Sequence, residues 1–127
     1  IELQALDFST LIDEARDGEL QAFDVGWIAD YPDPENFLDL LFHSGSVENY
    51  TGYCNRSVDD LLEQARIVAD ADDRYALYRQ AEQAVVADAP CVPLWYGQSY
   101  YLVKPKVKGF EPSPMIVPML KDVWIEE

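Results

Sequence analysis

Two consecutive segments with a helical spacing of apolar residues, 57–68 and 72–87, constrain the fold of this chain more than any other feature. In the first segment the apolar residues recur at i, i+3 and i+4, and they are Val58, Leu61, Leu62, Ala65 and Val68. Ser57 is the predicted N-cap of this helix, and Pro90 ends the second helix. Because the connection between them is short, the two helices are predicted to form a hairpin.

Two shorter helices are predicted before this hairpin. The first begins with Asp7 or Ser9 as its N-cap and ends at Gly18. The second covers residues 36–43, after a loop rich in proline. Its inward-facing residues are expected to be Phe37, Leu40 and Leu41.

Runs of alternating or β-branched and aromatic residues predict strands elsewhere. They cover residues 1–6, 23–29, 92–103 and 123–125, and the third run is either two strands or one bent strand. With 127 residues, of which 49% are apolar, the chain has enough material for one domain with a packed core.

The chain is strongly acidic, with 24 Asp and Glu against 9 Lys and Arg and a formal net charge of −15. Phosphate backbones repel such a chain, so nucleic-acid binding is excluded. The charge fits either a salt-adapted source or a soluble extracellular surface. No apolar run reaches the ~20 residues that a membrane-spanning helix needs.

Catalytic and metal chemistry have little support. The single histidine, His43, is expected to end a helix, and the acidic run 70–73 to begin one. Tyr75 and Ala81 stand where a calcium loop starting at Asp70 would need glycine and glutamate. An acid-based hydrolase remains a rival, but no spacing selects its pair of carboxylates. Neither an enzyme nor a cofactor is predicted.

The two cysteines, Cys54 and Cys91, are too few for a disulfide scaffold, and neither lies in a C-x-x-C motif. They form either one structural disulfide or two free buried thiols, and the sequence leaves both alternatives open.

The segment that points to a ligand is Gly26 to Pro34, in which Trp27 and Asp30 lie at the end of a predicted strand and two prolines fix the loop beyond. A carboxylate held beside an indole can receive a cation such as an α-ammonium, because the ring shields the ion pair and adds cation–π attraction. The alternative is that Asp30 and Asp33 only stabilise the turn or cap the next helix, and that Trp27 belongs to the core.

This segment and others resemble the extracellular solute-binding proteins of family 5, the dipeptide and oligopeptide receptors of bacterial ABC transporters. The resemblance is carried, in order, by residues 23–34, 58–62, 77–82, 90–96 and 103–109. Members of the family are about four times as long as this chain. The resemblance therefore implies that the chain is a fragment, the C-terminal quarter of such a protein.

The implied fold is α/β, part of a type II periplasmic-binding-protein-like lobe with a helical hairpin and a C-terminal return strand. Residues 1–103 would form the segment of the C-terminal lobe, and residues 104–127 would return toward the other lobe. Because the strand at 123–125 would pair with a sheet outside the chain, its exposed edge leaves a dimer or a swapped assembly open.

In peptide-binding members of the family, the acid of the W-x-x-D pattern accepts the α-ammonium of the peptide, which implies this role for Asp30. The cleft around it would be lined by Trp27, Ile28, Tyr31, Trp95 and Tyr96. The implied protein is extracytoplasmic, periplasmic or anchored as a lipoprotein, and delivers a peptide to a membrane permease. Two alternatives stay open: a non-peptide ligand such as an oligosaccharide or a nickel complex, and an acidic protein-interaction domain.

Overall fold

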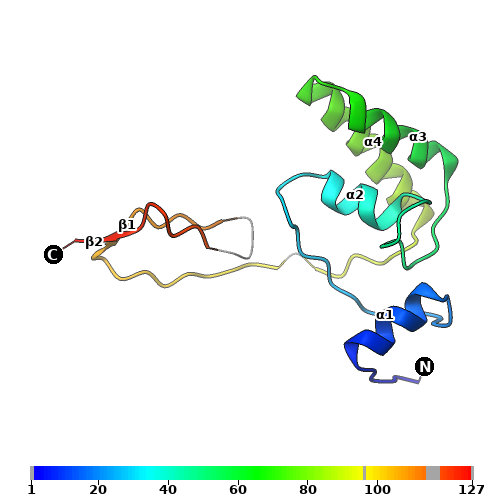
Figure 1. The fold of residues 1–127 in the computed structure, drawn as a ribbon, viewed down its shortest axis with the longest axis horizontal. Coiled ribbons are helices and arrows are strands. Elements are labelled where there is room, and N and C mark those ends of the chain that lie inside the picture. Colours follow the sequence, from blue (N-terminus) through cyan, green and yellow to red (C-terminus); the bar gives the residue numbers. More distant parts are fainter. Residues whose placement is uncertain (1, 96, 114–117, 127) are drawn as a thin grey trace.

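Helices and an extended segment occupy different ends of the molecule (Figure 1). The structure is a computed structural model that describes residues 2–95, 97–113 and 118–126. Its helices are α1 (Phe8–Arg16), α2 (Glu35–Phe42), α3 (Arg56–Ile67) and α4 (Ala71–Asp88), and its strands are β1 (Val107–Lys108) and β2 (Trp124–Ile125). We call residues 8–88 the helical part and the described residues within 97–126 the arm.

The core of the helical part lies between α3 and α4, which form the predicted hairpin. Its buried side chains are Val58, Leu62, Ala65, Tyr78, Ala81 and Val85. These positions repeat at three- and four-residue intervals, so they lie on one face of each helix. Helix α2 adds the partly buried Leu38 and Phe42. The hairpin prediction is confirmed.

The helix ends follow from local hydrogen bonding. As predicted, Asp7 caps α1 by accepting a hydrogen bond from the Thr10 main-chain N–H (3.1 Å), and the acidic run at 70–73 begins α4. The predicted cap Ser57 is wrong. Asn55 caps α3 instead, because its side-chain oxygen accepts from the first-turn N–H groups of Ser57 (3.0 Å) and Val58 (3.4 Å).

The inward face of α2 is also different from the prediction. Its buried residues are Asn36 and Asp39, whereas Phe37 is 40% exposed and Leu40 and Leu41 are only partly buried. The reason is that α2 is held by polar contacts. Asp39 pairs with Arg66 of α3, and Asn36 bonds to the preceding loop. Apolar spacing therefore selected the wrong face.

Most of the predicted strands are absent from the described residues. Residues 2–6, 23–29, 92–95 and 97–103 form no strand, and residues 1 and 96 of these predicted runs lie outside the described part. A strand needs a hydrogen-bonded neighbour, and alternation of apolar residues does not supply one. No helix of the described chain has the length and apolarity needed to cross a membrane.

The last predicted strand is present as β2, and its partner lies in the same chain. It pairs antiparallel with β1, with Val107 opposite Ile125 and Lys108 opposite Trp124. The expectation that this strand lacks a partner is wrong, and with it the dimer or swapped assembly loses its basis. Beside the pair, Gly109 has a φ of +70°, and a Cβ there would lie 2.0 Å from the Asp122 carbonyl oxygen.

Candidate ligand-binding site

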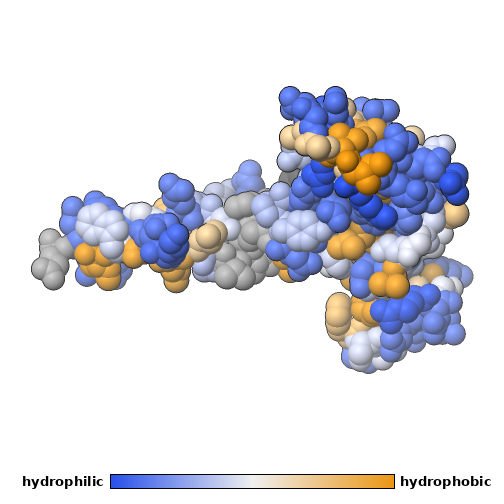
Figure 2. Space-filling view, turned by 45° about the horizontal axis from the view of Figure 1, so that its top comes forward, coloured by the Kyte–Doolittle hydropathy of each residue, from blue (hydrophilic) through white to orange (hydrophobic). Residues whose placement is uncertain are grey.

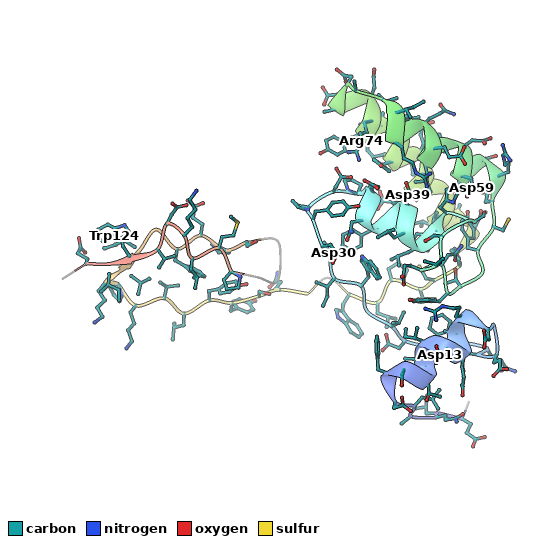
Figure 3. All side chains as sticks on the ribbon, in the orientation of Figure 1. Asp13, Asp30, Asp39, Asp59, Arg74 and Trp124 are labelled. Carbon is teal, nitrogen blue, oxygen red and sulfur yellow. The ribbon has the colours of Figure 1, made fainter. Side chains whose placement is uncertain are left out.

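The candidate site is the segment of residues 27–35, a loop whose last residue, Glu35, is also the first residue of α2 (Figure 3). Asn36 in the first turn of α2 is completely buried and holds the start of this loop. Its side-chain oxygen accepts hydrogen bonds from the indole Nε1–H of Trp27 (3.1 Å) and from the main-chain N–H of Asp30 (2.9 Å). Its amide also donates to Oδ2 of Asp30 (3.4 Å). One side chain therefore sets the position of Trp27 relative to Asp30.

A second contact fixes the far end of the loop. The Arg74 guanidinium of α4 donates two hydrogen bonds to the Asp33 carboxylate, at 2.7 and 2.8 Å. It also donates to the Tyr78 hydroxyl (3.1 Å) and lies 4.8 Å from the centre of that ring. The hydrogen bonds from Arg74 lower the pKa of Asp33. Asp33 also accepts from the Glu35 N–H (2.9 Å) two residues along, which is the turn role considered for it, whereas the N-cap position of α2 is Pro34 and has no side-chain capping bond.

Asp30 differs from Asp33 in its surroundings. Its side chain is exposed, and within the described part of the chain no arginine or lysine forms an ion pair with it. Because Asn36 holds its main chain and one carboxylate oxygen, the charge of Asp30 is fixed in place but not neutralised. Chemically, the loop offers an oriented anion beside an indole, which suits a cationic group.

The structure brings together some of the predicted residues. Trp27 is half-buried and tied to Asp30 through Asn36, while Ile28 (60% exposed) and Tyr31 (40% exposed) flank them. Trp95 is 78% exposed on the segment that leads to the arm, and no hydrogen bond or ring contact among the described residues joins it to the loop. Tyr96 lies outside the described residues.

The sequence analysis missed Asn36 and Arg74, although each leaves a signal. Asn36 and Asp39 are polar residues spaced i, i+3 on a helix whose other residues are mostly apolar. Arg74 lies in the first turn of α4, where the helix dipole disfavours a cation. Polar residues in such places often have a tertiary partner.

A groove of about 630 Å³ lies elsewhere, and the residues that line it are drawn from the ranges 15–25, 49–52 and 90–94. Of the predicted ligand-contact residues that the structure describes, none lines it, although Cys91 does. Cys54 and Cys91 are both free and exposed, so neither alternative is confirmed in full: the two thiols are not bonded to each other, and they are not buried.

Metal ligands are not gathered anywhere in the described part of the chain. His43 ends α2, as expected. Its Nδ1 accepts from the Gly45 N–H (3.0 Å), and its Nε2 lies 3.4 Å from Glu63.

Several named proteins are similar in sequence to most of this chain. No protein-family model matches it. The chain is 37% identical over 110 residues to the probable deoxycholate-binding periplasmic protein YgiS of Escherichia coli (strain K12), covering 87% of this chain and 20% of that protein. It is 31% identical over 123 residues to the dipeptide-binding protein of the same organism, covering 94% of this chain and 23% of that protein.

A solved structure has the same architecture. The periplasmic binding protein DppA from Helicobacter pylori, in complex with the peptide STSA, superposes with a TM-score of 0.77 and 31% identity, covering 99% of this chain and 26% of that one. The expected periplasmic-binding-protein fold is thereby confirmed. The chain spans about a fifth of the length of the curated relatives and about a quarter of that structure.

Proposed function

The homologues of this chain include dipeptide- and oligopeptide-binding proteins of the solute-binding protein family 5, whose C-terminal portion it matches, and from this premise we propose that the chain forms part of a peptide-binding site. These homologues are periplasmic binding proteins and not enzymes, which is the class that the sequence indicated.

The observation that carries the proposal is the state of Asp30. Its carboxylate is exposed, is oriented by the buried Asn36, and has no cation from the described chain beside it. A peptide with a free N-terminus brings an α-ammonium, which can supply the missing charge. The half-buried indole of Trp27 next to it lowers the local exposure to water and so strengthens the ion pair.

The rest of the proposal concerns the wider site and the whole protein. Ile28, Tyr31, Trp95 and Tyr96 would contact the peptide beyond its terminus. Residues 1–103 would belong to one lobe of the receptor, and residues 104–127 would return toward the other. The receptor would release its peptide to a membrane permease, from the periplasm or as a lipoprotein at the cell surface.

Calorimetric titration of the full-length protein with trialanine and with N-acetyl-trialanine tests the role of Asp30. We expect Asp30→Asn to weaken trialanine binding by roughly ten- to a hundredfold, because a charge-assisted hydrogen bond is lost. Binding of the acetylated peptide should change little. Asp24→Asn, at an exposed acid three residues before the loop, controls for the loss of one negative charge. Equal weakening of both peptides by Asp30→Asn would remove Asp30 from this role.

A second candidate is a non-peptide ligand, because a relative at 37% identity is named for deoxycholate. Asp30 disfavours it, since deoxycholate is itself an anion and would meet an unneutralised carboxylate. Binding of deoxycholate without binding of either peptide would establish this candidate in place of the first.

A further inference from the structure

We propose that Asn36 and Arg74 are positioning residues that make the site selective for a cationic terminus, because they hold and isolate the charge of Asp30. This inference rests on the proposed function. It adds to that function the two side chains that neither the sequence motif nor the exposed surface reveals.

Asn36 acts through both halves of its amide. The side-chain oxygen has two lone pairs, and the indole of Trp27 and the main chain of Asp30 occupy both. The amide nitrogen then turns toward the Asp30 carboxylate. Since Asn36 is fully buried, water cannot readily replace these bonds, and a variant without the amide leaves the two N–H groups without their partner.

Arg74 acts on the other acids of the loop. It neutralises Asp33 through two hydrogen bonds and lies 3.8 Å from a carboxylate oxygen of Glu35. Asp30 is thereby left as the acid of the loop without a cation in the described chain. Without Arg74, Asp33 would become a competing anion three residues away, and the far end of the loop would be released from α4. Both effects lower the preference for a charge placed at Asp30.

The chain offers matched controls for both residues. Asp39 lies one turn after Asn36 on the same buried face of α2, and it accepts hydrogen bonds from Arg66 of α3 at 2.5 and 2.7 Å. The Arg66–Asp39 pair has the same chemistry as the Arg74–Asp33 pair, but it joins α2 to α3, and within the described chain no side-chain hydrogen bond or ion pair joins it to residues 27–35, although Arg66 interacts electrostatically with Glu35. Asp39→Asn and Arg66→Met therefore loosen the packing of α2 without removing a bond to residues 27–35.

The measurement is the ratio of the Kd for N-acetyl-trialanine to the Kd for trialanine, obtained by calorimetry on the full-length protein and its variants. The wild-type ratio is measured first, because a ratio near one contradicts the proposed function itself. We expect Asn36→Ala to lower the ratio by about tenfold and Arg74→Met by about threefold. Asp39→Asn and Arg66→Met should keep it within about twofold of the wild type. Urea unfolding of all four variants shows how far each is destabilised.

A high wild-type ratio that Asn36→Ala and Arg74→Met both retain would overturn this inference and leave the proposed function standing. An equal drop in the two control variants would also overturn it, because the effect would then come from the packing of α2 as a whole. Should Asn36→Ala fail to fold, Arg74→Met carries the test, since Arg74 is partly exposed and its loss leaves the Asn36 contacts in place.

Discussion

The helical part and the arm use apolar residues in opposite ways. In the helical part, Val58, Leu62 and Ala65 of α3 have no exposed surface. In the arm, Leu102 is fully exposed and Tyr100 is 87% exposed, and Figure 2 shows apolar groups on the surface of both parts. Apolar content is thus no guide to which segment builds a core within this chain. A spacing of three and four residues is a guide, because it puts the apolar side chains on one face of one helix.

The largest expected effect on stability comes from a comparison of one leucine in the hairpin core with one leucine in the arm. Leu62→Ala should lower the free energy of unfolding by about 3 kcal/mol, because it leaves a cavity between α3 and α4. Leu102→Ala should change it by less than about 0.5 kcal/mol, because the side chain contacts water. Urea unfolding followed by far-UV circular dichroism measures both. Similar losses in the two variants would mean that the arm is as tightly packed as the hairpin, and the comparison would fail.

An intermediate effect on stability is expected where the loop of residues 27–35 is joined to the helical part by the Asp33–Arg74 pair. Arg74 lowers the pKa of Asp33 in the folded state, so the stability from this pair is fully present above the unfolded pKa of about 3.9 and is lost as the pH falls through the lower folded pKa. Asp33→Asn should therefore cost about 1 kcal/mol at about pH 7 and almost nothing at strongly acidic pH.

The measurement is urea unfolding of Asp33→Asn and the wild type at a series of pH values. Arg74→Met serves as the partner variant, and in its background Asp33→Asn should have little further effect at any pH. A cost of Asp33→Asn that does not depend on pH would show that the ion pair is not its origin.

The smallest effect on overall stability is expected at Gly109. Alanine there meets both an unfavourable φ and the Asp122 carbonyl oxygen, so Gly109→Ala should separate β1 from β2. Hydrogen exchange of the Glu126 amide, which donates to the Lys106 carbonyl (2.8 Å), should become faster. The unfolding free energy of the helices should change by less than about 0.5 kcal/mol. A substantial loss of helix stability would show that the arm supports the hairpin.

The features that were predicted correctly from the sequence are the helices, which depend on residues close together in the chain. The helices lie where their caps and apolar spacing placed them, to within one or two residues, apart from the shift from Ser57 to Asn55. The predicted strands are absent at 23–29, 92–95 and 97–103 of the described chain, because pairing depends on a neighbour that a single strand does not specify.

In the candidate site, too, residues marked by a local pattern could be predicted and residues held by distant partners could not. Trp27 and Asp30 could be singled out because two prolines mark the loop that follows them. Asn36 and Arg74 could not be assigned their partners. The bond from Arg74 reaches 41 residues back along the chain to Asp33, and no local pattern encodes such a distance.

The distance along the chain between Asp33 and Arg74 also affects the order in which parts of the molecule fold. Helices α3 and α4 are joined by residues 68–70 only, so their contacts close a short loop and can form early. The loop of residues 27–35 leaves the ribosome before either helix, yet it cannot be fastened until Arg74 has been synthesised and α4 has packed. We therefore expect the loop of residues 27–35 to be among the last elements to become fixed, on a hairpin that is already folded.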